Sequence, residues 1–314
     1  MTIAQVQPMR AGKSITIISV TGHQDYAQGS AYAIERSFNE LLKKFPAEQL
    51  KCVLVSPEKP EECHPYIIHI PCEPFSYLEY NLYLLYLLDP LVTTDFALIV
   101  QNDGFILNGD NWQDEFFDYD YIGAPLLTYI SCIDGGYQQY GRAHWIEHCN
   151  HPPENLIEPM NGGFSLRSKR LLGILREMNI QWSLPIPKVL HKLPAKLEYP
   201  ALYHHEDLFL TGYKRRELEE CGIRFAPSEI ASYFSLEDNL IVTHRKLDIT
   251  KIFGCHLMGY FVLSKPNIVL MNKRVDFEDG NVMTNPFCYI ALQSGIDISI
   301  PQHFWKDEMN NFDE

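Results

Sequence analysis

The sequence predicts an α/β fold in which a mixed, mostly parallel sheet is flanked by helices. Three observations indicate this. Short apolar or β-branched segments recur through the first hundred residues, an amphipathic segment with helical spacing separates the first two, and polar, glycine-containing segments follow several of the predicted strands. Alternation of this kind is typical of parallel strands joined by crossover helices.

The first predicted unit is a strand, a polar turn and a helix. Residues 14–20 (SITIISV) are β-branched and predict a strand, and Thr21-Gly22-His23 follows as a polar turn. The predicted helix begins near Gly29 and ends before Pro46. Its apolar stripe has spacings of three and four and comprises Ala31, Ile34, Phe38, Leu41, Leu42 and Phe45.

Two more strands, a helix and a fourth strand follow. The strands are predicted at residues 51–55, 66–70 and 97–100, and the helix at 77–88. Right-handed crossovers would bring the turns after these strands to one edge of the sheet. We therefore expect a single cleft along that edge.

Composition restricts the class of protein. The chain has 314 residues, is 46% hydrophobic and carries a formal charge of −14, which disfavours nucleic acid as a partner because backbone binding depends on Lys and Arg. No apolar stretch has the length of a membrane span, and no secretory signal is expected at the N-terminus. Eight cysteines without a CxxC pair predict reduced thiols rather than a zinc ribbon or disulfide framework. A cytoplasmic location is expected.

The segment after the fourth strand is the first candidate for chemistry. Gln101-Asn102-Asp103-Gly104 ends a buried apolar run, so Asp103 is expected at the carboxyl end of a central strand. A carboxylate there can bind Mg²⁺ or Mn²⁺ together with a phosphate-bearing ligand. A turn aspartate that accepts hydrogen bonds from backbone amides explains the residue equally well.

Three later segments add candidates. Asn161-Gly162-Gly163-Phe164 would allow close approach of the backbone to a ligand, with Ser168 capping the next helix; a tight turn is the alternative. His204-His205-Glu206-Asp207 precedes an apolar helix, whose N-terminal dipole favours a capping role for one carboxylate; Glu206 or Asp207 could instead be a general base if it faces the cleft. His256, in FGCH, could reach the same cleft, although a lone histidine is more often structural.

The middle of the chain holds weaker signals. The spacing of Trp112, Phe116 and Tyr119 indicates packing more than sugar stacking. Residues 130–159 predict a long loop of the kind that forms a lid or binds an acceptor. Its possible metal ligands are His144, His148, Cys149 and His151, whose spacing alone is a weak indication.

Several common motifs are missing from the sequence. There is no GxxxxGK[ST] segment, no GxGxxG after the first strand, no GxSxG and no HExxH. A P-loop nucleotidase and a standard dehydrogenase are therefore disfavoured.

Taken in order, six segments carry a resemblance: QNDGF, NWQDEFFDYDYIGAPL, NGGFSLRS, HHEDLF, CGIRFAPSEIASYFSLE and FGCH. Together they resemble a family of mainly bacterial glycosyltransferase-like proteins of GT-A type, over roughly residues 14 to 260. The resemblance implies a GT-A-like Rossmann-type domain at 14–260, an N-terminal extension at 1–13, and a C-terminal extension at 261–314 packed on the same domain.

The resemblance also implies roles for individual residues. The donor, a nucleotide-diphosphate sugar, would contact Thr21, His23, Gln101, Asn102, Asp103, Gly104 and His256. The sugar or acceptor would contact Asn161, Gly162, Gly163 and Phe164. A divalent cation, Mn²⁺ or Mg²⁺, would bind Asp103 and His256, although Gln101 stands where the family pattern has a second aspartate. The base of an inverting reaction would be Asp207 or Glu206, with Asp207 preferred.

The resemblance leaves the acceptor open: a glycan, a lipid-linked sugar or another hydroxyl compound. Peripheral association with a membrane also stays open. Two alternatives remain for the function. One is a nucleotide-sugar-binding protein without catalysis, suggested by the missing aspartate. The other is a nucleotidyltransferase, disfavoured because Thr21-Gly22-His23-Gln24-Asp25 lacks the glycines and the lysine of that class.

Overall fold

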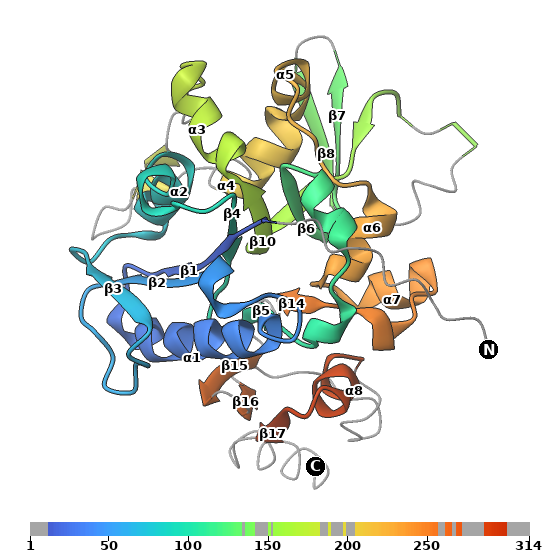
Figure 1. The fold of residues 1–314 in the computed structure, drawn as a ribbon. Helices are drawn as coiled ribbons and strands as arrows, with labels where there is room; N and C mark the ends of the chain where they lie inside the picture. The colour runs from blue at the N-terminus through green and yellow to red at the C-terminus, as the bar shows by residue number, and fades with distance from the viewer. Residues whose placement is uncertain are drawn as a thin grey trace, which may run out of the picture.

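A computed structural model gives the fold shown in Figure 1. It describes residues 12–133, 136–141, 150–151, 153–182, 188–189, 197–198, 205–256, 261–265, 268–271 and 286–299. The fold is mixed α/β, with a six-stranded sheet at its centre and helices on both faces.

The central sheet has the strand order β3-β2-β1-β4-β10-β6. Its strands are β1 (Ile15–Val20), β2 (Leu50–Ser56), β3 (Ile67–Pro71), β4 (Phe96–Ile99), β6 (Tyr121–Pro125) and β10 (Met160–Ser168). The first four pair in parallel, and β10 runs antiparallel to both of its neighbours. The expectation of a mixed, mostly parallel sheet is confirmed. This strand order does not by itself identify the fold as GT-A.

Alternation along β1 directs its side chains to two different cores. Ile15 and Ile17 pack with residues of α1 (Gln24–Leu41), such as Ile34. Ile18 and Val20 pack on the opposite face, in the cluster that includes residues of α2 (Tyr77–Tyr86) and α3 (Lys169–Glu177). Because both faces are covered, all six residues of β1 are buried, including the polar Thr16 and Ser19.

Smaller sheets extend the fold. β5 (Gly104–Ile106) pairs with β14 (Gly254–His256), which also pairs with β13 (Ser235–Leu236). β7 (Tyr129–Ile133), β8 (Gly136–Tyr140) and β9 (Leu156–Ile157) form an antiparallel sheet. The described part of residues 130–159 therefore corrects the expectation of a long loop, because the segment forms strands there.

The remaining α-helices and strands of the described residues lie in the second half of the chain. They are α4 (Glu206–Leu208), which continues into a π-helical turn at Phe209–Tyr213, α5 (Arg215–Glu220), α6 (Ser228–Phe234), α7 (Asn239–Arg245) and α8 (Pro286–Gln293), with the strands β11 (Lys188–Val189), β12 (Leu197–Glu198), β15 (Phe261–Lys265), β16 (Ile268–Met271) and β17 (Asp297–Ser299). β15 packs against α1, and the Leu263 amide donates to the Asn102 carbonyl at 2.8 Å. The described C-terminal residues thus contact the polar turn after β4.

Element boundaries differ modestly from those predicted. α1 begins at Gln24 rather than near Gly29, directly after the polar turn, and it ends at Leu41. Ser168 caps α3 as expected, since its side chain accepts a hydrogen bond from the Leu171 amide at 3.1 Å. Trp112 and Phe116 pack edge to face at 5.3 Å and are buried, which confirms a packing role.

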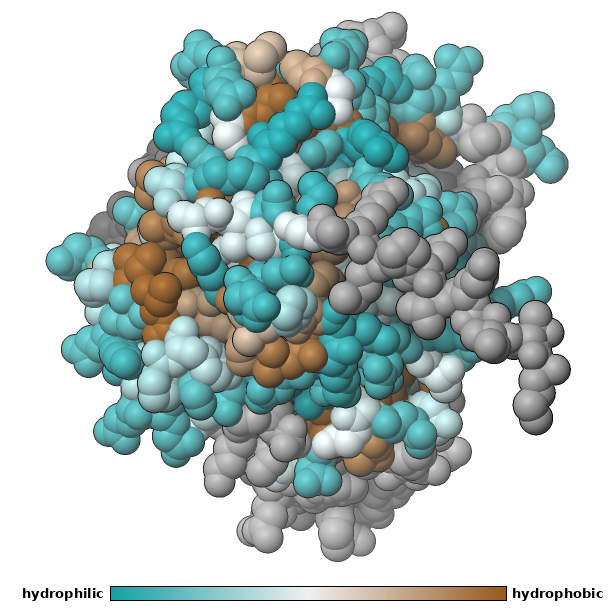
Figure 2. Space-filling view, in the orientation of Figure 1, coloured by the Kyte–Doolittle hydropathy of each residue, from teal (hydrophilic) through white to brown (hydrophobic). Residues whose placement is uncertain are grey.

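The surface in Figure 2 is mostly hydrophilic, with separate hydrophobic areas. Among the described residues, none of the helices combines the length and the apolar character needed to cross a membrane. Among the cysteines described with their side chains, Cys52, Cys63, Cys72, Cys221 and Cys255 are free thiols.

Candidate functional site

The polar turn after β4 lies at the carboxyl end of the central sheet. Gln101 and Gly104 exchange two backbone hydrogen bonds, at 2.8 and 3.0 Å, so Asn102 and Asp103 form the tip of a tight hairpin between β4 and β5. The Asp103 side chain is 14% exposed. The sequence prediction of a carboxylate at this edge is confirmed in its position.

A pocket of about 510 Å³ opens beside this turn. Its lining combines the turn after β1 with the turn after β4, through Thr21, Gly22, His23, Gln101, Asn102 and Asp103. Aromatic side chains supply much of the rest, namely Tyr26, Phe75, Tyr77 and Tyr80, and Val262 of β15 closes it. The volume falls within the range of small-molecule sites. Five predicted donor-binding residues therefore share one pocket.

His256 reaches the same turn from β14, where it pairs with Gly104. Its Nε2 lies 3.1 Å from Oε1 of Gln101 and 3.7 Å from the Asp103 carboxylate. Its Nδ1 faces Glu237, 3.7 Å from that carboxylate. The ring therefore lies between two acidic side chains.

This acidic environment changes how His256 titrates. Burial lowers its pKa, but the attraction of Asp103 and the interaction with Glu237 outweigh burial and raise the pKa to about 9. Burial raises the pKa of Glu237, and the charges of Asp207 and Asp103 raise it further. The raised pKa of His256 reflects the two neighbouring carboxylates, which favour a positive charge on the ring.

The two glycines of β10 allow the other predicted segments to meet here. A Cβ atom on Gly163 would lie 2.3 Å from Nε2 of His256, and one on Gly162 would lie 2.2 Å from Oε1 of Glu206. Neither position has room for a side chain. The Gly162 amide donates to the Asp207 carboxylate at 3.1 Å, which brings that residue to the same place.

The neighbours of the glycine pair support it in different ways. The Asn161 side chain accepts a hydrogen bond from the Gly163 amide at 2.6 Å, and so holds the turn. Phe164 is fully buried and stacks on Phe234, with ring centroids 5.2 Å apart. Phe164 therefore belongs to the core beneath the site, although we predicted that it would contact the sugar or acceptor.

Glu206 and Asp207 have different environments. Glu206 is buried and pairs with Arg167, whose two terminal nitrogens lie 2.8 and 2.7 Å from its two oxygens. Asp207 is partly exposed, and accepts hydrogen bonds from the amides of Gly162 and Leu208. Of the two, Asp207 keeps carboxylate surface for an incoming group. Both lie on α4; the nearby His204 lies outside the described residues.

Several residues of the site were not predicted, among them Arg167, Glu237 and Tyr80. Tyr80 hydrogen-bonds to Gln101, and Arg167 and Glu237 are the charged partners described above. The available signal was a charge inside an otherwise buried strand, as in Phe164-Ser165-Leu166-Arg167, because a buried charge requires a partner.

The donor set for a divalent cation is small. Within the described ranges, no group of three or more His, Cys, Asp or Glu side chains is arranged to hold a metal ion. Asp103 and His256 supply one oxygen-bearing and one nitrogen-bearing ligand in an acidic setting, which fits a cation that completes its shell with phosphate oxygens. The histidine cluster suggested at His144, His148 and Cys149 lies outside the described residues, except for His151.

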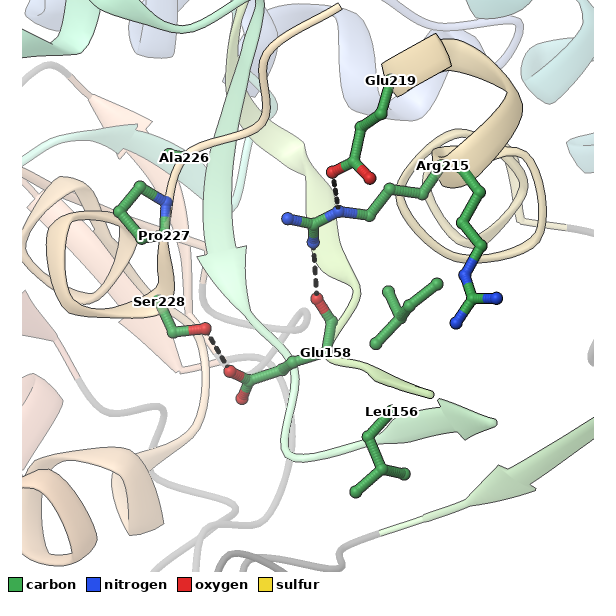
Figure 3. Close-up of a pocket in the computed structure, with 9 residues that line it drawn as sticks. Leu156, Glu158, Arg215, Glu219, Ala226, Pro227 and Ser228 are labelled. Atoms are coloured by element: carbon green, nitrogen blue, oxygen red, sulfur yellow. Dashed lines mark hydrogen bonds and ion pairs between the residues drawn. The ribbon is translucent and has the colours of Figure 1, made fainter. Parts of the chain in front are cut away.

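A second pocket, of about 360 Å³, lies beside the start of β10 (Figure 3). Glu158 accepts hydrogen bonds from Ser228 and, at 2.6 Å, from Arg245. Arg215 donates to the Glu158 carbonyl at 3.3 Å and to Glu219 at 2.9 Å. These charged groups are already paired with one another, so they stabilise the fold around this pocket. We call the contacts of Glu158 with Ser228 and Arg245 the Glu158 clasp.

The fold and the pocket define an α/β protein with a polar, acidic site at the carboxyl edge of a mixed sheet. A family model described as a protein of unknown function, DUF5672, matches residues 80–256. The match covers more than half of the chain, and the chain belongs to this family. The comparison with curated proteins found no match.

The matched span contains the polar turn after β4, the glycine pair, Asp207 and His256. It begins at Tyr80, one of the pocket residues, and ends at His256, the histidine beside Asp103. The turn after β1, the aromatic residues Tyr26, Phe75 and Tyr77, and Val262 of β15 line the pocket from outside the matched span.

Proposed function

We propose that the protein is a glycosyltransferase that uses a nucleotide-diphosphate sugar and an acceptor hydroxyl. One observation carries this proposal: Asp103, Gly163, Asp207 and His256, far apart in the sequence, meet beside a pocket of about 510 Å³ at the carboxyl edge of the sheet. An open α/β sheet binds ligands at this edge. The GT-A-like assignment rests on this placement together with the motif resemblance.

The pocket has the features that a nucleotide requires. Its aromatic side chains, including Tyr26 and Tyr77, can pack on a base, and the turn after β1 adds polar groups such as Thr21. The diphosphate would then lie toward Asp103 and His256. These two residues would hold a divalent cation, which neutralises charge on the leaving diphosphate when it is bound.

Asp207 is the preferred base. Its carboxylate is fixed by two backbone amides, at 3.1 Å from Gly162 and 2.7 Å from Leu208, and it is adjacent to the glycine pair that would face the sugar. An inverting transfer needs a carboxylate that removes the proton of the acceptor hydroxyl during attack. Glu206 is less suited to this role because both of its oxygens bind Arg167.

The test is a panel of nucleotide sugars measured by thermal shift, with and without Mn²⁺, followed by transfer assays with the donor that binds. A bound donor raises the unfolding midpoint because it stabilises the native state. We expect Asp103→Ala to lose this donor-dependent rise. We expect Asp207→Asn to keep it and to lower kcat by about 10² to 10⁴.

The assays also separate the alternatives. Donor binding without transfer or hydrolysis, across a broad set of acceptors, would favour a binding protein without catalysis. Release of diphosphate from a nucleoside triphosphate would favour a nucleotidyltransferase. Unchanged transfer by Asp207→Asn would remove that residue from the mechanism.

A further inference from the structure

Two buried polar atoms of the site have no hydrogen-bond partner: Nδ1 of His256 and Oε2 of Glu237, both within the described part of the chain. They lie on neighbouring segments, because His256 ends β14 and Glu237 directly follows β13, which pairs with β14 in parallel. Glu237 is 6% exposed. The pair is therefore shielded from water.

Buried polar atoms without a hydrogen-bond partner destabilise the folded state, so their presence in this site calls for a functional explanation. A buried polar atom without a partner destabilises the folded state by about 1–3 kcal/mol. Here Nδ1 faces the Glu237 carboxylate and lies 3.7 Å from its other oxygen, Oε1, slightly beyond hydrogen-bonding distance. A small rotation of the ring would join them.

The opposite side of the ring faces the pocket. Nε2 lies 3.1 Å from Gln101 and 3.7 Å from Asp103, both of which line the pocket of about 510 Å³. The imidazole thus has a carboxylate behind it and the candidate cation ligands before it. Histidines that bind metals commonly donate their second N–H to a carboxylate, which fixes the tautomer and the direction of the ring.

We propose that Glu237 is a positioning residue that accepts the Nδ1–H of His256 and so directs Nε2 toward a divalent cation held with Asp103. This inference deepens the proposed function, on which it rests, because the cation would serve the donor diphosphate. Glu237 acts only through His256 and touches neither donor nor acceptor.

A merely structural role for Glu237 makes a different prediction. If the carboxylate only filled space in the core, substitutions would lower stability and leave cation binding by the folded protein unchanged. If Glu237 positions His256, variants that keep an acceptor oxygen at residue 237 should bind the cation, and variants that lose it should bind the cation more weakly. Affinity, measured on folded protein, therefore separates the two roles.

The experiment compares Glu237→Gln with Glu237→Leu in the full chain. Free Mn²⁺ is quantified by electron paramagnetic resonance, first with Mn²⁺ alone and then with Mn²⁺ and inorganic diphosphate. We expect Glu237→Leu to weaken Mn²⁺ binding about 10- to 100-fold. Glu237→Gln keeps an oxygen that accepts the Nδ1–H, and it should restore most of the affinity.

Ser235→Ala is the matched control. Ser235 is buried on β13, two residues before Glu237, and its hydroxyl also lacks a hydrogen-bond partner among the described residues. This variant should bind Mn²⁺ like the original protein. Thermal unfolding of every variant establishes which of them are folded at the temperature of the binding measurement.

Two results would overturn the inference. One is folded Glu237→Leu protein that binds Mn²⁺ with unchanged affinity. The other is the original protein binding no Mn²⁺ even with inorganic diphosphate. Neither result decides the proposed function, because sugar transfer is assayed separately and can proceed without a metal.

Discussion

At the scale of single residues, two adjacent carboxylates have been given different environments. Glu206 and Arg167 form a buried ion pair, with side chains 4% and 0% exposed. The Arg167 guanidinium also lies 5.0 Å from the centre of the Tyr121 ring. This pair fixes α4 against β10 and thereby places Asp207 at the glycine turn.

The pair gives a stability prediction. Glu206→Ala leaves the Arg167 charge buried without its partner, so we expect the free energy of unfolding to fall by about 3–5 kcal/mol. Asp207→Asn should cost much less, because Asp207 is partly exposed and the amide oxygen can still accept a backbone hydrogen bond. Urea unfolding of both variants measures the difference. Equal losses would contradict the division of roles between these neighbours.

Gly163 gives a second prediction at this scale. A Cβ atom here would meet the His256 ring at 2.3 Å and the Gln101 side chain at 2.9 Å, so Gly163→Ala must displace both. We expect the folded variant to lose the donor-dependent rise in the unfolding midpoint. Gly141→Ala is the control, since a Cβ atom there meets nothing within 4 Å. A normal donor response in Gly163→Ala would show that His256 does not contribute to donor binding.

At the scale of elements, the clasp at Glu158 connects three parts of the fold. Glu158 lies two residues before the start of β10, Ser228 is the first residue of α6, and Arg245 is the last residue of α7. Arg245 and Glu158 side chains are only 14% and 8% exposed. The clasp therefore anchors α6 and α7 to the strand that carries the glycine pair.

A substitution of Glu158 tests whether its contacts anchor α6 and α7 to β10. We expect Glu158→Gln to lower the free energy of unfolding by about 2 kcal/mol, because it removes the charge from hydrogen bonds that Arg245 and Ser228 make. Lys214→Ala is the comparison, since its pair with Glu217 is 32% and 47% exposed and should matter far less. Chemical unfolding of the two variants measures both effects. A similar loss in both would mean that the clasp contributes no more than a surface pair.

At the scale of the whole molecule, the hydrophobic core buries thiols of distant segments, Cys52 on β2 and Cys288 on α8, and burial disfavours their ionisation. Burial raises the pKa of Cys52 to about 12 and that of Cys288 to about 12. In the unfolded chain these thiols ionise near their ordinary pKa of about 8.5. The folded state thus holds protons that the unfolded state releases.

This linkage predicts an alkaline loss of stability. The contribution of each thiol is fully present below the unfolded pKa, and is lost as pH rises from about 8.5 through about 12. We expect each buried thiol to lower the free energy of unfolding by about 2 kcal/mol between pH 8 and pH 10. Urea unfolding at several pH values measures the slope. Cys52→Ala should reduce that slope, and an unchanged slope would assign the alkaline loss to other groups.

Local patterns were sufficient for much of the fold. The β-branched run at β1 predicted a strand, and the apolar run at β4 predicted a buried strand. The spacing from Ala31 to Leu41 predicted a helix, because the side-chain pattern is a property of the segment itself. The turn at Asp103 was also predicted from local sequence, because polar residues and a glycine directly follow the apolar run of β4. The start of α1 was misplaced by five residues because His23 gives no capping hydrogen bond that the sequence could reveal.

By itself, the sequence determined the alternation of strands and helices and the polar turns that follow them. Only the tertiary structure decided which charges became partners: Glu206 with Arg167, and Glu237 with His256. The physical reason is that secondary structure follows from neighbours along the chain. The environment of a buried charge, by contrast, depends on strands that are distant in sequence and adjacent in the sheets.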